Sequence, residues 1–368
     1  MTAAIAGWEN NGQQNLSRNL DTGDIIITCS HALKIGIGIL VTVVCLGGAL
    51  WGIDFEEVQA GFRRANYATL PVLLAFLYLY FWLKAIRWRL LLRPLRRFQT
   101  RELVGPMMIG FMGNNLLPAH LGEFARVFVL GHESKLPKTA VFSSVVLERV
   151  FDAASILGFF GVSLLLVELP QTYKTTSLYT AGLIVVGFLV FAVYVFWTDQ
   201  FVRAAEWALN RLRFLPATLR GTLTEMLESG AGGLASLRNA KLTFWILITS
   251  ALQWFLMGVM VHVALWSFGL HLPLHASLIV MGVTAFGVAI PSTPGFFGVV
   301  QFCFWISLRI FGVEKADAFA ASVYYHLSQY IPITLVGLYY LNRLGLRFGD
   351  IARETIHEAD DEPTKVTS

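Results

Sequence analysis

Six stretches of the chain are apolar over the length that a bilayer requires. A helix that crosses the hydrocarbon core needs roughly 20 apolar residues. Stretches of this kind recur from near the N-terminus to just before the C-terminal tail, at 33–53, 68–88, 140–167, 177–197, 242–266 and 318–341. The pattern therefore predicts an all-α polytopic membrane protein with six full spans.

Two further apolar regions are interrupted. Residues 103–130 are broken by Asn114-Asn115 and Pro118, and residues 276–311 by the run Pro291-Ser292-Thr293-Pro294-Gly295. Two crossings would need ~40 residues, which neither region has, so each is predicted to be a re-entrant helical hairpin. Non-helical backbone at membrane depth occurs only where it is buried in protein or lines a water-filled cavity. The two breaks thus predict an interior cavity.

The order of elements repeats along the chain. The halves 33–167 and 177–341 both follow the order span, span, hairpin, span. Three crossings in each half place the halves in opposite orientation, which is the inverted-repeat plan of many transporters. A coincidence of topology is the alternative, because the two halves have no strong sequence identity.

Lysine and arginine are concentrated in alternate loops, which predicts the orientation. The loops 87–102 and 199–241 and the segment after the last span are rich in these residues, and the intervening loops are poor. Both termini, the polar segment 1–32 and the disordered tail 343–368, are then cytoplasmic and flank a transmembrane domain at 33–342. The first hairpin would enter from the cytoplasm and the second from outside. Part of the loop 199–241 either lies on an anionic leaflet or is a solvated linker.

Composition supports this class of protein. Charged residues make up only 14% of the chain, against about 25% in soluble domains, and mean hydropathy is +0.61. The net charge of +4 suits basic loops, and without a soluble basic face it does not indicate nucleic-acid binding. The sequence has no recognisable metal-ligand set, catalytic motif or nucleotide-binding motif. It therefore predicts no metal, no cofactor and no catalytic residues.

Ionisable residues within the apolar stretches are the main functional candidates. Each costs ~2.5–3.5 kcal/mol at the centre of an inserted helix. In the span 140–167, Glu148 and Asp152 share a face at i, i+4, and Arg149 and Asp152 are in reach at i, i+3. These charges either line a substrate pathway or form an ion cluster that only fixes helix packing.

The first break is followed by His120, Glu123 and Arg126. If residues 121–130 are helical, Glu123 and Arg126 can pair at i, i+3. The start of that helix would direct its N–H groups and positive dipole end into the cavity, which favours an anion. A purely structural interpretation makes Asn115 a cap and leaves these three residues unexplained.

The second break and the last span add further polar candidates. Pro294 and Gly295 mark the break, Gln301 follows it, and His326 lies on the last span. His326 either faces the cavity or hydrogen-bonds a neighbouring helix.

At these positions the chain resembles the lysylphosphatidylglycerol synthase transmembrane family, a flippase-like membrane domain. The resemblance covers about residues 35–342 and rests on three motifs: Asn115-Leu116-Leu117-Pro118 through Gly122-Glu123 to Arg126, Glu148-Arg149 with Asp152, and Pro291-x-x-Pro294-Gly295-x-x-Gly298. There are departures from the family pattern. His120 and His326 stand where the family has arginine, Phe296 replaces a second glycine, and Gln301 stands where a glutamate is common.

The resemblance implies translocation of a lipid headgroup across a bacterial cytoplasmic membrane. The lipid would be a phospholipid, a polyprenyl phosphate or a hopanoid, with an anionic or zwitterionic headgroup. The implied binding residues come from both breaks and both charged segments: Asn114, Asn115, His120, Glu123, Arg126, Glu148, Arg149, Asp152, Pro294, Gly295, Gln301 and His326.

The family's bifunctional members carry a C-terminal aminoacyltransferase domain. This sequence ends soon after its last span, so aminoacyl transfer is not expected of it. A separately encoded lipid-modifying synthase is the expected protein partner, and a homo-oligomer is compatible with the sequence. The alternatives to a transporter are a membrane-embedded transferase and an accessory subunit of such a synthase.

Overall fold

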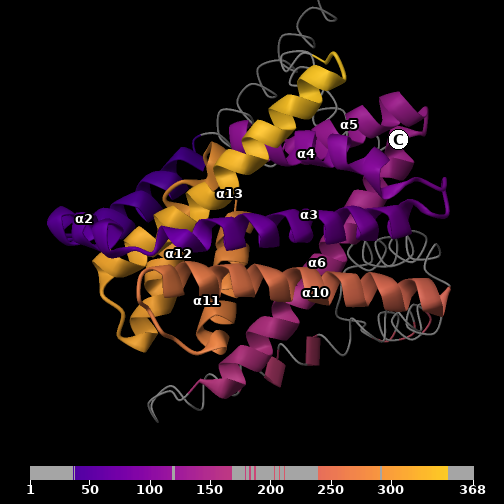
Figure 1. Ribbon diagram of the computed structural model, residues 1–368. Coiled ribbons are helices and arrows are strands. Elements are labelled where there is room, and N and C mark those ends of the chain that lie inside the picture. The colour runs from indigo at the N-terminus through magenta and orange to yellow at the C-terminus, as the bar shows by residue number, and fades with distance from the viewer. Residues whose placement is uncertain are drawn as a thin grey trace, which may run out of the picture.

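The computed structural model describes residues 38–117, 121–167, 239–290 and 292–346, together with the isolated positions Gly36, Tyr179, Gly182, Leu183, Val186, Gly187, Arg203, Trp207 and Arg211. Every element in these ranges is a helix (Figure 1). In chain order they are the helix Gly38–Leu50, α2 (Phe55–Arg64), η1 (Tyr67–Thr69), α3 (Leu70–Leu92), α4 (Thr100–Leu116), α5 (Gly122–Ser134), α6 (Lys138–Leu166), α10 (Ala240–Ser267), α11 (Leu274–Ala289), η3 (Pro294–Phe296), α12 (Val299–Leu308), η4 (Arg309–Phe311) and α13 (Lys315–Arg343).

Several of these helices are long and apolar enough to cross a bilayer. Four qualify within the described ranges: Tyr67–Leu92, Lys138–Leu166, Lys241–Ser267 and Pro294–Phe311. The pair Gly38–Leu50 and Phe55–Arg64, bent by 81°, adds a fifth if it forms one span. The all-helical, multi-pass prediction is therefore confirmed, whereas the exact count of six spans stays a prediction. The predicted span 177–197, the loop 199–241 and most of both terminal segments lie outside the described residues.

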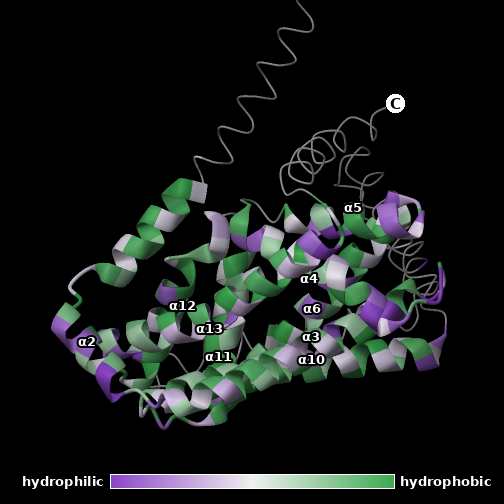
Figure 2. Cartoon of the chain, turned by 45° about the horizontal axis from the view of Figure 1, so that its top comes forward, coloured by the Kyte–Doolittle hydropathy of each residue, from purple (hydrophilic) through white to green (hydrophobic). Residues whose placement is uncertain are grey.

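Apolar side chains cover the outside of the helices as well as the inside. Leu165, Trp245 and Leu335 are each at least half exposed on α6, α10 and α13. Figure 2 shows hydrophobic residues along the outward faces of the long helices, and hydrophilic residues at α2 and near the helix ends. Apolar surface on this scale is typical of a face that contacts lipid.

Both predicted breaks do interrupt helices. α4 ends at Leu116 and α5 begins at Gly122, and Pro118 to His120 between them lie outside the described residues. α11 ends at Ala289 and α12 begins at Val299, with Gly295 (φ 74°) and Gly298 (φ 85°) in left-handed conformations between them. In each case the two short helices pack against each other. This is the arrangement expected of a helical hairpin, and the depth to which each hairpin enters the bilayer stays a prediction.

Glycines allow the two helices of the first hairpin to approach closely. A Cβ added to Gly113 would lie 2.8 Å from the Cα of Gly122, and one added to Gly110 would lie 2.7 Å from the Cβ of Arg126. A Cβ on Gly122 would overlap the carbonyl oxygen of Gly110. Only glycine fits at such contacts. The close approach places the stem of Arg126 directly against α4.

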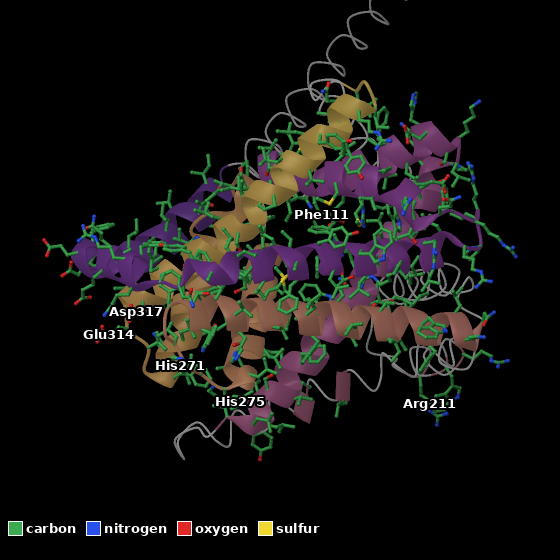
Figure 3. The ribbon with its side chains drawn as sticks, in the orientation of Figure 1. Phe111, Arg211, His271, His275, Glu314 and Asp317 are labelled. Carbon is green, nitrogen blue, oxygen red and sulfur yellow. The ribbon has the colours of Figure 1, made fainter. Side chains whose placement is uncertain are left out.

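The described loops lie at the two ends of the molecule (Figure 1). At one end, the Asn66 amide donates to the Ser267 carbonyl oxygen at 2.7 Å, and Arg64 pairs with Asp317 at 3.7 Å. Figure 3 places His271, Glu314 and Asp317 together at this end, with Phe111 in the interior. At the other end of the molecule, Arg101 at the start of α4 and Arg343 at the end of α13 line one common cavity. The arginine-rich segments that are described therefore share a side, and its assignment to the cytoplasm stays a prediction.

Candidate functional site

Seven charged side chains meet in the interior between α3, α5 and α6. We call this set the ion cluster; its members are Lys84, Arg87, Glu123, Arg126, Glu148, Arg149 and Asp152. Five of them, all except Glu123 and Arg149, are at most 3% exposed. Burying an ion is costly unless it is paired and hydrogen-bonded. The contacts around each carboxylate therefore decide what the cluster can do.

Glu148 lies at the centre of the cluster. Its carboxylate oxygens are 2.7 Å from Lys84 Nζ, 3.3 Å from Arg87 Nη2 and 3.3 Å from Arg126 Nη1. The ring of Trp88 lies beneath the Arg126 guanidinium, with its centroid 5.0 Å away. One buried carboxylate on α6 thus faces three cations from two other helices.

Asp152 lies one turn further along α6, on the same face. It accepts a hydrogen bond from Arg87 Nη1 at 2.6 Å and another from the indole N–H of Trp254 on α10 at 2.7 Å. Lys84 Nζ and Arg149 Nη1 lie 3.5 and 3.4 Å from its other oxygen. The predicted shared face of Glu148 and Asp152 and the predicted reach of Arg149 to Asp152 both match this geometry.

Glu123 and Arg149 form the accessible edge of the ion cluster. They pair at 2.8 Å, and their side chains are 20% and 39% exposed. We expected Glu123 to pair with Arg126 on the same helix, but Arg126 bonds Glu148 instead. The close contact between α4 and α5 holds Arg126 on the buried face of α5, where the carboxylate of α6 is the nearer partner.

The positive charges of the ion cluster outnumber its carboxylates, and some of its guanidinium N–H donors have no acceptor among the described residues. Four cations face three carboxylates, which leaves one positive charge in excess. Among the described residues, Arg126 Nε and Nη2 and Arg87 Nε have no hydrogen-bond partner, and Arg87 Nη2 lies near Glu148 without the alignment of a hydrogen bond. Guanidinium donors of this kind match phosphate or carboxylate oxygens.

Two members of the cluster, Lys84 and Arg87, are not among the site residues that the sequence predicts. Arg87 was assigned to the loop 87–102, but α3 continues to Leu92 and buries Arg87 completely. The available signal was Lys84, a charge inside the apolar stretch 68–88, with Arg87 three residues later on the same helical face.

The residues of the second break lie around a separate cavity of about 190 Å³. Asn115 and His326 line it, and Gln301 hydrogen-bonds His326 Nδ1 through its amide nitrogen at 3.3 Å. Gln301 Oε1 also accepts the Gly298 N–H at 2.7 Å, and Asn115 Nδ2 donates to Thr334 Oγ1 at 2.9 Å. The polar groups predicted around the second break therefore do come together.

The remaining predicted residues have different positions. Gly295 lies in the turn of the second break after Pro294, so close to the Tyr330 ring that a Cβ would be 2.8 Å from it. Asn114 is buried beside Gly122, and its Oδ1 has no partner among the described residues. His120 lies outside the described residues. The sequence predicted one cavity, whereas the structure has the ion cluster and a separate cavity beside it. Trp254 connects the two, because it lines the cavity and its indole N–H donates a hydrogen bond to Asp152 of the cluster.

The family comparison confirms the resemblance. Residues 35–337 match the model of the lysylphosphatidylglycerol synthase TM region. The chain belongs to this family. At the position where the family pattern has a second glycine, Phe296 adopts a left-handed conformation (φ 58°), which is the conformation that glycine adopts most easily.

Two curated relatives are similar to parts of this chain. The UPF0104 membrane protein MJ1078 of Methanocaldococcus jannaschii is 26% identical over 228 residues, which cover 61% of this chain and 90% of the relative. Glycosyltransferase AglD of Haloferax volcanii is 34% identical over 137 residues, which cover 37% of this chain and only 22% of AglD. No solved structure gives a significant match. The family and these relatives support a lipid-related function in a membrane.

Proposed function

We propose that this protein moves or presents a membrane lipid, and that the ion cluster together with the first break binds the lipid headgroup. The observation that carries the proposal is Arg126, which is buried and keeps two guanidinium nitrogens without an acceptor among the described residues. It lies one turn into α5, whose N-cap residue Leu121 makes no side-chain hydrogen bond to the helix. The N–H groups at a helix N-terminus and guanidinium donors both favour an anion such as phosphate.

The accessible edge of the cluster suggests how a headgroup would arrive. Arg149 is the half-exposed cation, so a phosphate would meet it before Arg126. Glu123 pairs with Arg149 and is the carboxylate at this edge that an amine would reach, and Glu148 and Asp152 balance the buried cations. A phospholipid or a polyprenyl phosphate would use these donors directly, and a hopanoid would need an anionic headgroup to do so.

The cellular setting is part of the same proposal. The distribution of lysine and arginine supports cytoplasmic termini. A bacterial cytoplasmic membrane is the setting that the family resemblance implies. Both halves would rock around the broken helices while the acyl chains stay in lipid, as the inverted-repeat plan suggests.

Reconstitution into vesicles tests the proposal. Leaflet crossing of a fluorescent phospholipid is measured by the fraction that dithionite quenches from outside. Arg149→Gln should slow the crossing about tenfold or more, because it removes the first charge-assisted contact with the phosphate. Arg64→Gln, which removes an exposed arginine at the other end of the molecule, is the matched control. An unchanged rate in Arg149→Gln would show that the headgroup site is wrong.

A second candidate function is that of a membrane-embedded transferase or an accessory subunit of one. The similarity to part of Glycosyltransferase AglD favours it, because that relative is named as a transferase. In that case Glu148 or Asp152 would serve as a base. Formation of a glycosylated or aminoacylated lipid without any leaflet crossing would favour this function over transport.

A further inference from the structure

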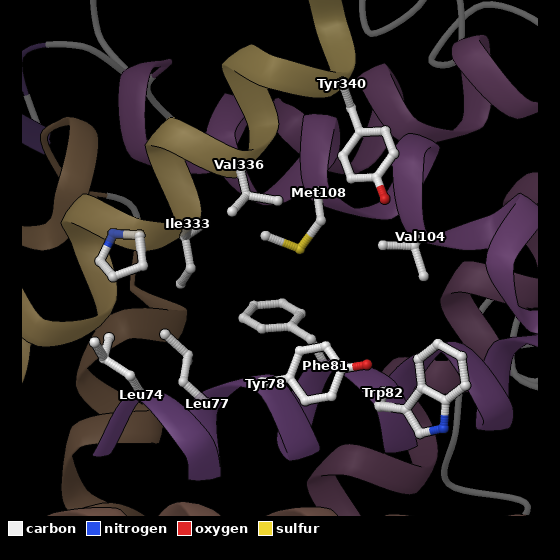
Figure 4. A pocket seen from close by; sticks show the side chains of 11 residues that line it. Leu74, Leu77, Tyr78, Phe81, Trp82, Val104, Met108, Ile333, Val336 and Tyr340 are labelled. Atoms are coloured by element: carbon white, nitrogen blue, oxygen red, sulfur yellow. The ribbon is translucent and has the colours of Figure 1, made fainter. Parts of the chain in front are cut away.

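An apolar groove on the outside of the helices carries a further inference. It lies between α3, α4 and α13 and encloses about 370 Å³, within the size range of small-molecule sites. Leu74 and Phe81 line it from α3, Met108 from α4, and Ile333 and Val336 from α13 (Figure 4). Leu74 and Val336 are each 39% exposed, so the groove is open along its length. Its open side lies in the apolar outer surface and therefore faces lipid.

The groove continues into a charged cavity. That cavity has a volume of about 610 Å³ and shares Tyr78, Trp82 and Tyr340 with the groove. Tyrosine and tryptophan are the residues that occupy the boundary between hydrocarbon and headgroups. The combined space thus passes from apolar, through aromatic, to charged within one continuous lining.

Two arginines dominate the charged end. Arg101 at the start of α4 and Arg343 at the end of α13 are exposed, and neither has an ion-pair partner within the described ranges. Two carboxylates are in the lining. Glu102 accepts a hydrogen bond from the backbone N–H of Gln99 and so caps α4, and Glu133 is the carboxylate that a ligand can reach. The end therefore offers two guanidinium groups for a phosphate and one carboxylate for an amine.

From this arrangement we infer that the groove binds one acyl chain of a glycerophospholipid whose phosphate lies between Arg101 and Arg343. The inference rests on the proposed function in taking a membrane lipid as the ligand, and it adds a lipid class and a second place of contact. A chain that enters sideways from the bilayer replaces lipid contacts with Leu74, Phe81 and Val336. The arginines then supply the headgroup selectivity that the apolar wall lacks.

The groove adjoins the ion cluster. Phe81 on its floor packs edge-on against Phe111, with ring centroids 5.1 Å apart, and the Phe111 ring lies 5.3 Å from Lys84 Nζ. One layer of aromatic rings therefore separates the bound acyl chain from the cluster. A lipid held in the groove is placed beside the site proposed for headgroup passage.

Native mass spectrometry of the purified full-length chain tests the inference. The probes are phosphatidylglycerol, phosphatidylethanolamine and diacylglycerol with identical acyl chains. Both phospholipids should bind at one molecule or more per chain, and diacylglycerol, which lacks the phosphate, should bind about tenfold or more weakly. Equal retention of all three would overturn the inference and mark the groove as a surface for any bilayer lipid.

Variants locate the binding within the groove. Val336→Trp fills the groove and should remove one retained phospholipid per chain, whereas Leu335→Trp, at the neighbouring position that is 60% exposed and outside the groove, should not. If both variants retain the lipid equally, the acyl chain is not bound in the groove and the inference fails.

A second pair of variants keeps the test valid if the tryptophan changes fold poorly. The double change Arg101→Gln with Arg343→Gln, at two exposed positions, should weaken phospholipid binding about tenfold and leave diacylglycerol unchanged. Arg97→Gln, at an exposed loop position outside the lining, is the control. The proposed function fails separately: in that case Arg149→Gln leaves leaflet crossing unchanged while lipid remains bound in the groove.

Discussion

Removal of the central carboxylate should destabilise the protein more than removal of the cation closest to it. Glu148→Gln keeps the shape of the side chain but leaves Lys84, Arg87 and Arg126 buried with Asp152 as their remaining buried anion. Loss of one member of a buried ion pair costs about 3–5 kcal/mol when the other charge stays buried. We expect a loss of that size in the free energy of unfolding, because the excess positive charge of the cluster increases.

Lys84→Met should cost less, although it removes the shortest contact of Glu148, at 2.7 Å. It abolishes the charge excess, and Glu148 keeps Arg87 and Arg126 as partners. Unfolding by denaturant in detergent micelles, followed by tryptophan fluorescence, measures both variants. Glu123→Gln, which removes the exposed pair with Arg149, should change stability by at most about 1 kcal/mol and serves as the control. A larger loss for Lys84→Met than for Glu148→Gln would refute the assignment of excess positive charge.

Three further predictions concern backbone conformation and the second break. Lys135→Gly should raise the free energy of unfolding by about 1–2 kcal/mol in a denaturant titration, because Lys135 ends α5 in a left-handed conformation (φ 56°); a loss of stability would contradict this. Gly122→Ala should prevent correct packing of the first hairpin and reduce the yield of monodisperse protein in size-exclusion chromatography. Gly47→Ala, where no atom lies within 4 Å of the added Cβ, should behave like the unchanged protein. Gln301→Glu and His326→Arg should each lower the free energy of unfolding. The double variant should be about 0.5–3 kcal/mol more stable than the sum of the two single losses predicts, because a family-like ion pair replaces the 3.3 Å Gln301–His326 hydrogen bond. Purely additive losses would contradict that pairing.

The sequence predicted those features of the fold that depend on local pattern. Apolar length predicted α3, α6 and α10, and interruption by polar residues and proline predicted the helix breaks around Asn115 and Gly295. The i, i+4 spacing correctly placed Glu148 and Asp152 on one face. Each of these depends only on residues that are close in the chain.

The partners across helices could not be predicted in the same way. Local spacing favoured a pair between Glu123 and Arg126, but the tertiary contact to Glu148 prevails because a buried carboxylate gains more from a cation than an exposed one does. The prediction that Arg87 lies in a loop was wrong, because Arg87 is the first of several arginines that follow one another in the sequence and such a run is typical of a basic loop. Its burial depends on Asp152, 65 residues later in the chain.

The two breaks are related in topology but differ in chemistry. At the second break, the Gln301 side chain accepts the Gly298 N–H and bonds His326, so the donors there are already engaged within the protein. At the first break, within the described residues, the Leu121 side chain does not cap α5 and two nitrogens of Arg126 have no acceptor. An anion is therefore favoured at the first break and not at the second. If the two halves do form an inverted repeat, its symmetry does not extend to the ligand: the first hairpin is suited to hold the phosphate, and the second, with its neutral Gln301–His326 pair, is suited to line the path beside it.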